Sequence, residues 1–309
     1  MAFKKDSWLV RGVLVLAVVG FVAVGVIGAF SGRSQSPADR ANPASTQNIE
    51  DTISQLEGEI SGYKAVLGRE PNNETALLGI IQAQIQLAQL GKGDLADTVE
   101  PLERLTELNP DVQYAIALAQ TKQQLEDLEG AAQVYRRVLT ENPGNVQALE
   151  GLVALLLSQG RTEAAAGLLR DTLATADQTN ELNPGSVDKL SVKLLLGQVL
   201  VEQESYGEAL KLYDEAIADA QVASPTQPDF RPTLAKALVL QEQGKDSEAK
   251  PLFDQALALA PTQYKDSVQQ LIDERTAPAQ AAESSEPEGD ADEDAEDASV
   301  EPEEAPVAP

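Results

Sequence analysis

The sequence predicts an all-α protein in which antiparallel helix pairs stack into a curved array, and three observations favour this class. Alanine, leucine, glutamine and glutamate dominate the composition, and these residues are strong or adequate helix formers. Apolar residues recur at spacings of three and four along the segments that follow residue 48, and no comparable strand-like alternation occurs. A pattern of small and bulky residues also recurs at intervals of 33, 34, 44 and 40 residues, the longer two containing extra polar segments.

The chain has a formal net charge of −27 and contains neither histidine nor cysteine. Such an acidic surface repels phosphate backbones, so we expect no nucleic-acid partner. The missing side chains remove disulfides, imidazole and thiolate catalysis and the usual zinc ligands, and the sequence contains no calcium loop. We therefore expect no enzymatic activity, no cofactor and no metal site.

Residues 1–11 form a short basic amino terminus, and residues 12–32 are predicted to be a transmembrane helix. The 21 residues between Arg11 and Arg33 carry no charge. As a helix they span about 30 Å, the thickness of a bilayer hydrocarbon core. Trp8 lies where an interfacial aromatic residue would. A cleaved signal peptide is the alternative, but the long apolar run and the poor cleavage site favour an uncleaved anchor.

Three basic residues precede the predicted span and two follow it, which favours a single-pass protein with its repeats on the trans side, periplasmic or lumenal. A cytoplasmic location of the repeats stays open. Gly28 and Gly32 form a GxxxG motif, so a homo-oligomer is conceivable but has no other support. Residues 33–47 include Pro37 and Pro43 and lack apolar periodicity, and we expect a flexible tether there.

Residues 48–275 are predicted to form the helix array itself. Its first helix shows an apolar face at alternating spacings of four and three: Ile49, Ile53, Leu56, Ile60, Tyr63 and Leu67. Polar, proline-containing extra segments around 180–187 and 222–228 are expected to be loops. The predicted helix pairs are 74–108, 112–141, 146–175, 190–219 and 230–259, with capping helices at 49–69 and 262–275.

The pattern is most complete in one segment: Leu196, Gly197, Leu200, Tyr206, Ala209, Tyr213, Ala216 and Ile217. It resembles the tetratricopeptide repeat (TPR), a 34-residue helix–turn–helix unit, over about two-thirds of the chain. The resemblance implies an α-solenoid of about five repeats. It also implies that Gly197 and Ala209 face each other at a helix crossing, that Tyr213 fills the gap to the next repeat, and that proline follows second helices. Glu59 and Lys236 depart from the family's pattern.

In this family the first helices line a concave groove that binds a peptide or a partner's surface, which a stacked array with one continuous inner face also allows. The groove would be aliphatic and amide-bearing, without the paired basic residues that clamp acidic chaperone tails. We expect an extended or helical protein partner with apolar side chains, although some of these positions could instead belong to the core. The candidate positions are Leu78, Gln82, Ile85, Ile116, Gln120, Gln123, Glu150, Leu157, Leu194, Gln198, Val201 and Leu238.

Residues 276–309 contain twelve acidic residues and no basic ones, and we expect a disordered acidic tail. It would serve as a solubilising segment or as an electrostatic arm for a basic partner. Five basic and two acidic residues give residues 1–47 a charge of +3, which leaves −18 for residues 48–275.

These features predict a membrane-anchored adaptor or scaffold that binds partner proteins and assists the assembly or stabilisation of membrane-associated complexes. The plan of a basic start, one span and repeats resembles membrane-anchored bacterial TPR proteins, including cyanobacterial ones of photosystem or pigment-enzyme biogenesis. Two alternatives remain open. One is a periplasmic or envelope factor in quality control or cell-wall assembly, and the other is a regulatory subunit of an enzyme complex.

Overall fold

The computed structural model describes residues 43–276. The basic amino terminus, the predicted span at 12–32 and nearly all of the acidic tail lie outside the described residues. Within the described part, no helix combines the length and apolar character needed to cross a bilayer. Its elements are α2 (Pro43–Leu67), α3 (Glu74–Gln89), η3 (Leu95–Thr98), α4 (Val99–Leu108), α5 (Val112–Gln124), α6 (Leu128–Glu141), α7 (Val146–Ser158), α8 (Thr162–Leu182), α9 (Lys189–Glu202), α10 (Tyr206–Ala223), α11 (Arg231–Glu242), α12 (Asp246–Leu259) and α13 (Thr262–Thr276).

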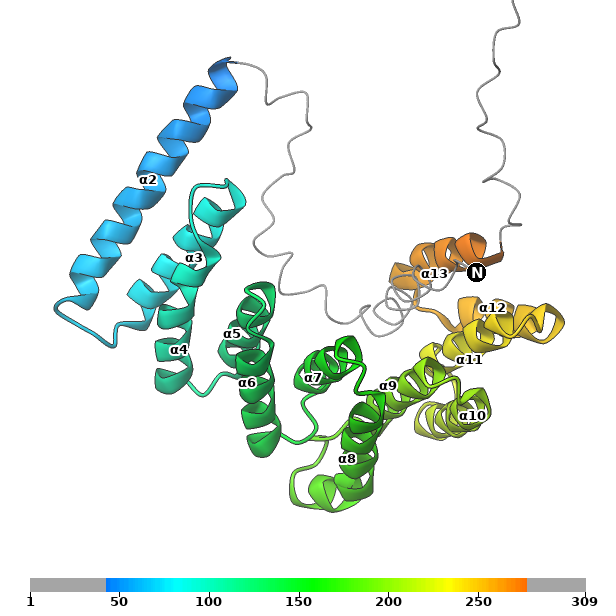
Figure 1. Ribbon diagram of the computed structural model, residues 1–309. Coiled ribbons are helices and arrows are strands. Elements are labelled where there is room, and N and C mark those ends of the chain that lie inside the picture. The colour runs from blue at the N-terminus through cyan, green and yellow to red at the C-terminus, as the bar shows by residue number, and fades with distance from the viewer. Residues whose placement is uncertain (1–42, 277–309) are drawn as a thin grey trace, which may run out of the picture.

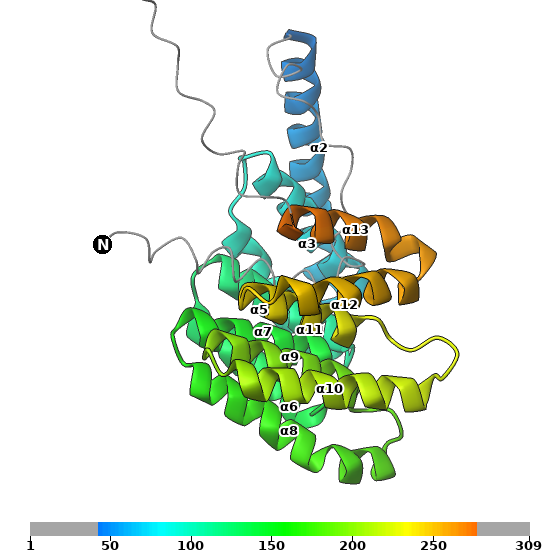
Figure 2. The same ribbon diagram turned by 90° about the vertical axis from the view of Figure 1, so that its right-hand side faces the viewer.

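Consecutive helices pack against one another as pairs, and the pairs follow an arc from α2 to α13 (Figure 1). The first helices of neighbouring pairs, α5, α7, α9 and α11, also contact one another in succession. In Figure 1, α7 lies on the inner side of the arc and α8 on its outer side. Figure 2 shows α8, α10 and α12 running across the molecule in stacked layers. The first helices therefore line the concave face.

The five predicted pairs and both capping helices are confirmed, because helices of the structure occupy each predicted range and differ only at some of the ends. One boundary differs at the amino-terminal side. Helix α2 begins at Pro43, so residues 43–47 of the predicted tether are helical. Proline is compatible with the first position of a helix, since its missing N–H would have no partner there.

The extra residues in the third and fourth pairs are loops only in part, because they also lengthen α8 and α10. Helix α8 continues to Leu182 and α10 to Ala223, beyond the predicted ends at 175 and 219. Buried Ala176 and Ala220 extend the packed face of each helix by a further turn. Small buried residues thus keep both extensions helical.

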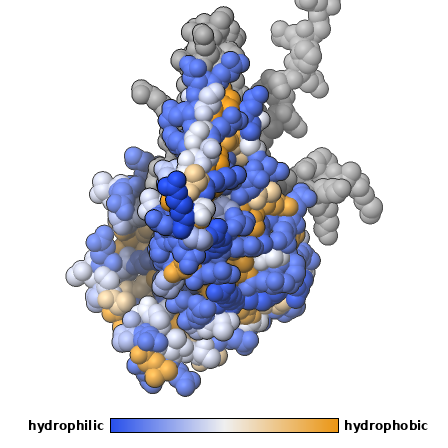
Figure 3. All heavy atoms as spheres, turned by 90° about the vertical axis from the view of Figure 1, so that its left-hand side faces the viewer, coloured by the Kyte–Doolittle hydropathy of each residue, from blue (hydrophilic) through white to orange (hydrophobic). Residues whose placement is uncertain are grey.

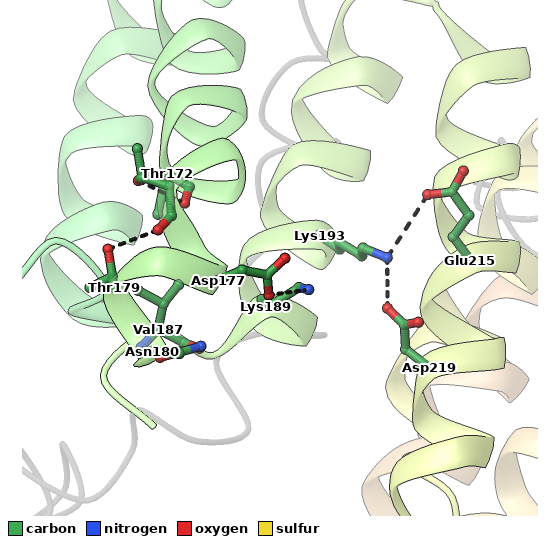
Figure 4. Close-up of polar contacts among 10 residues, drawn as sticks. Thr172, Asp177, Thr179, Asn180, Val187, Lys189, Lys193, Glu215 and Asp219 are labelled. Carbon is green, nitrogen blue, oxygen red and sulfur yellow. Dashed lines mark hydrogen bonds and ion pairs between the residues drawn. The ribbon is translucent and has the colours of Figure 1, made fainter. Parts of the chain in front are cut away.

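A single asparagine fixes the loop that follows α8 (Figure 4). The Asn180 Oδ1 accepts a hydrogen bond from the Val187 backbone N–H at 2.9 Å, and its Nδ2 donates one to the Val187 carbonyl at 2.9 Å. In the same region the Lys189 Nζ lies 2.9 Å from Asp177 of α8. The start of α9 is therefore fastened to the end of α8.

Three tyrosine rings lie directly over glycines of a neighbouring helix. The pairs are Tyr63 over Gly79, Tyr135 over Gly151, and Tyr213 over Gly197. A Cβ atom on any of these glycines would approach the ring to less than 3.0 Å, which real Cβ atoms essentially never do. The glycines are thus required by close packing rather than by backbone conformation.

This packing adds a contact of Gly197 that the sequence did not predict. A Cβ atom on Gly197 would first meet ring atoms of Tyr213 in the same repeat. Tyr213 covers a glycine of its own repeat, whereas Tyr135 of α6 covers Gly151 of α7 in the next pair. Ala209 is fully buried in the core.

Each of the five first helices ends in a residue with left-handed backbone geometry. Three are glycines, Gly91, Gly160 and Gly244, with φ between +70° and +72°. The other two are Glu126 at φ +62° and Glu204 at φ +57°. Glycine adopts this region without a steric penalty, whereas a side chain costs about 1–2 kcal/mol. The sharp turn between paired helices is thus retained even where it is strained.

We expect Gly197→Ala to lower the free energy of unfolding by about 1–3 kcal/mol, because the added methyl group collides with the Tyr213 ring. Gly167→Ala in α8 is the matched control. Nothing lies within 4 Å of its Cβ, so it should stabilise by about 0.5–1 kcal/mol through helix propensity. Urea denaturation of the purified chain checks both, and equal effects of the two substitutions would contradict the packing described.

We also expect Glu204→Gly to raise the free energy of unfolding by about 1 kcal/mol, because it relieves a side chain held at positive φ. The reverse change at the equivalent position, Gly160→Glu, should cost a similar amount. Denaturation midpoints of the two variants give the answer, and a shift of both in the same direction would refute the argument.

Candidate functional site

Charge is divided unequally between the inner and the outer helices. The first helices α3, α5, α7, α9 and α11 contain four acidic and five basic residues, a net charge of +1. The second helices, counted with η3, contain seventeen acidic and six basic residues, a net charge of −11. The acidity of the solenoid is therefore concentrated on the outside of the arc, and the inner helices are nearly neutral.

Basic residues of the inner helices point towards acids of the outer helices. Lys122 of α5 lies 3.0 Å from Glu103 of α4, and this hydrogen bond raises the pKa of Lys122 above its ordinary value. Lys193 of α9 lies 2.6 Å from Asp219 of α10 (Figure 4). Lys236 of α11 likewise pairs with α10. These lysines are paired with acids of the outer helices, which agrees with a groove that lacks a clamp for carboxylates.

The predicted groove positions fall into three classes of exposure. The exposed ones belong to the first two pairs, whereas the fully buried ones lie mainly in the last two pairs. Buried Ile116, Leu194 and Leu238 belong to the main hydrophobic core. Gln82 and Gln120 are exposed; Leu78, Ile85, Gln123, Glu150, Leu157 and Val201 are half-buried; Ile116, Leu194, Gln198 and Leu238 are buried.

Helix α9 explains this difference in exposure along the groove. Its residues from Leu194 to Leu200 are all buried, because α7 and α11 contact it on either side in addition to α8 and α10. The inner face is consequently closed at the fourth pair and more open at the first and second. Sequence spacing alone could not distinguish these cases, since the positions are equivalent in each repeat.

Two amides on the inner helices illustrate the polar part of this face. The Gln123 Oε1 accepts a hydrogen bond of 3.2 Å from the hydroxyl of buried Tyr135, whose pKa burial raises to about 12. The Nε2 of Gln198, only 7% exposed, has no hydrogen-bond partner within the described residues. An unpaired buried amide costs about 1–3 kcal/mol.

Glu150 of α7 is the only charged residue among the twelve predicted groove positions. It is half-buried, and no hydrogen bond or ion pair joins it to another residue that the structure describes. Burial raises the pKa of its carboxyl group to about 7, against the opposing influence of Arg231 in α11. A carboxylate with so strongly shifted a pKa is a candidate functional group.

Arg231 is held by other acids. Its Nε lies 3.0 Å from Asp229 Oδ2 and its Nη2 lies 2.8 Å from the same oxygen. Burial opposes the charge of Arg231, but the bonds to Asp229 and the charges of Asp188 and Glu150 together raise its pKa. Glu150 thus feels Arg231 at a distance without being paired with it.

A cavity of about 570 Å³ opens beside Arg231, between the ends of α9 to α13. Its wall is largely apolar, and the rings of Phe230 and Tyr264 lie 6.1 Å apart there. On the side of the molecule that carries α2, hydrophilic residues cover most of the surface, and hydrophobic residues form a strip along α2 and scattered patches below it (Figure 3). In the described part, no group of three acidic side chains is placed to hold a metal ion.

We expect Glu150→Gln to stabilise the chain at pH 8 by about 1–3 kcal/mol and to have little effect at pH 5. The folded state raises the pKa of Glu150, so the wild-type chain loses stability as pH rises from about 4.5 to about 7, and glutamine removes that loss. Urea denaturation at both pH values tests this. Exposed Glu163→Gln is the control, and a pH-independent effect of Glu150→Gln would contradict the assignment.

Comparison with known proteins bears on the repeats directly. Residues 87–145 and 122–183 match two family models described as tetratricopeptide repeat. The cellulose synthase operon protein C of Pseudomonas fluorescens (strain SBW25) is 30% identical over 174 residues, which are 54% of this chain and 12% of that protein. The chain therefore spans only a small part of this curated relative.

Two solved structures align with the chain at low sequence identity. BtubC from P. vanneervenii is 17% identical with a TM-score of 0.46, and the match covers 83% of this chain and 99% of that one. A tetratricopeptide repeat protein from Parabacteroides merdae is 18% identical with a TM-score of 0.44, over 74% and 89% of the two chains.

The family matches and the paired helices together indicate the type of repeat. Residues 87–183 match tetratricopeptide-repeat models, and the stacked helix pairs on either side of them are consistent with one TPR solenoid, a fold that implies a scaffold for protein–protein interaction.

Proposed function

We propose that this chain is a membrane-anchored adaptor that holds partner proteins on the concave face of its solenoid and assists the assembly or stabilisation of membrane-associated complexes. One observation carries the proposal. The inner helices of the first two pairs present exposed Gln82 and Gln120 beside half-buried Leu78 and Ile85, on a face nearly free of net charge. Such a mixed apolar and amide surface suits a peptide or helix with apolar side chains.

The membrane part of the proposal rests on the sequence of residues 12–32. A tether there would confine the repeats to the bilayer surface and raise their effective concentration near membrane-bound partners, to about the millimolar range for a short flexible link. Modest affinity for each partner would then suffice. A partner that binds through an acidic carboxy-terminal tail is disfavoured, because Lys122 and Lys193 are already paired with acids of the outer helices and cannot bind its carboxylates.

A second candidate is a factor of envelope or cell-wall assembly. The observation in its favour is the curated relative, whose name assigns it to a cellulose synthase operon. Both candidates use the same concave face and differ in the partner. An envelope factor requires the repeats on the trans side, whereas the adaptor is compatible with either side of the membrane.

Photo-cross-linking residues placed at Gln82 and Gln120 of the full chain should capture the same protein in native membranes. Gln133 on the outer helix α6, also exposed, is the matched control and should capture little of it. Mass spectrometry of the adducts identifies the partner. Identical products from all three positions, or none from any, would end the proposal that the concave face binds.

The anchor is tested separately. The full chain should stay in the membrane fraction after alkaline extraction, and a variant lacking residues 1–32 should be released. Protease treatment of sealed vesicles then shows on which side the repeats lie, which separates the trans location from the cytoplasmic one. Release of the full chain by alkali would count against an uncleaved span.

A further inference from the structure

We propose that Glu150 is the anchor point for a cationic group of the partner, a lysine or arginine side chain carried on an otherwise apolar segment. The inference rests on the proposed function, because it assumes that a protein segment lies on the concave face. Beyond the proposed function, it specifies the chemical class of the partner segment and names Glu150 as the residue that selects this segment.

The position of Glu150 in the repeat sets it apart. It lies fifteen residues before buried Ala165, and the residues fifteen before the equivalent buried alanines Ala131, Ala209 and Ala249 are Ile116, Leu194 and Leu234. A row of aliphatic positions on the inner helices is thus interrupted once, by a carboxylate near the middle of the solenoid.

A carboxylate at such a position is costly to ionise unless it has a partner, since the ionised form loses hydration on burial. The neighbouring cation does not supply that partner. Arg231 directs its Nε and Nη2 to Asp229 and is further balanced by Asp188, so it leaves Glu150 without an ion pair. The protein thus holds a half-buried carboxylate whose oxygen atoms can still accept hydrogen bonds from a ligand.

The charge of the ligand follows from these surroundings. An anionic ligand would meet the Glu150 carboxylate, the charge of nearby Arg231 is balanced by Asp229 and Asp188, and the chain as a whole carries −27. A cation is attracted on approach by this net charge and gains a charge-assisted hydrogen bond at the end. Half-buried Leu157 lies two helical turns further along the same face of α7, so the cation should belong to a segment with apolar side chains, as lysine and arginine do when their methylene groups are buried.

Two synthetic amphipathic peptides of identical composition and net charge test this. Both carry leucines at positions i, i+3, i+4 and i+7. The first has its lysine on the apolar face and the second has it on the polar face. Equal net charge removes the general attraction to an acidic protein from the comparison. We expect the first peptide to bind the full chain about tenfold more tightly than the second in fluorescence titrations.

Glu150→Gln should abolish that preference, and the matched control Glu163→Gln on α8 should retain it. The preference should also grow by up to about tenfold from pH 6 to pH 8, as Glu150 ionises. The other charged groups acting in this region are Arg231 of α11, which acts on Glu150, and Asp188 and Asp229, which act on Arg231. The peptide lysine stays charged throughout this range.

The outcomes separate the two levels of the argument. Equal binding of both peptides, or a preference that survives Glu150→Gln, overturns the role of Glu150 but leaves a concave face that binds apolar segments. Failure of both peptides to bind, together with no concave-face cross-links, overturns the proposed function and this inference with it.

Discussion

The solenoid depends on close approach of helices at points where one side chain is absent or very small. Gly79, Gly151 and Gly197 each receive a tyrosine ring on a surface where a methyl group would collide. The alanines of the second helices, such as Ala131 and Ala209, are completely buried. Because interiors pack at near-crystalline density, these contacts fix the separation and angle of each pair, and those angles accumulate into the curvature of the arc.

The curvature of the array also determines where charged and apolar side chains lie. Inner helices contact their neighbours in the next pairs, so their side chains have less solvent around them and are mostly apolar or amide. Outer helices are free to carry the acidic residues, and they draw the inner lysines outward into ion pairs. Exposed ion pairs contribute little to stability, about 0–1 kcal/mol each. Their larger consequence here is that they leave the inner face nearly neutral.

Much of the fold could be predicted because short, recurring sequence patterns determine how the helices of this chain pair. The buried alanine, the ring four residues later and the proline after the helix recur with the repeat, and the ends of α4, α6 and α12 follow that pattern. The extensions of α8 and α10 were harder to predict, since their polar composition is typical of loops. A few buried small residues and the Asn180 bonds keep them ordered. The partner of Gly197 could not be deduced from the spacing, because Ala209 and Tyr213 lie on one face of the same helix.

The candidate site was less predictable than the fold, and the reason is geometric. Equivalent positions of different repeats have similar neighbours in the sequence but differ in their exposure in the structure. Contacts among α7, α9 and α11 bury the inner face there, whereas the first two pairs stay more open. Leu194 and Gln120 were therefore both candidates, yet one is core and the other is exposed. Glu150 lies at the boundary between these two regions. A carboxylate retained there weakens the folded state at neutral pH, and natural sequences usually accept such a cost only where function gains from it.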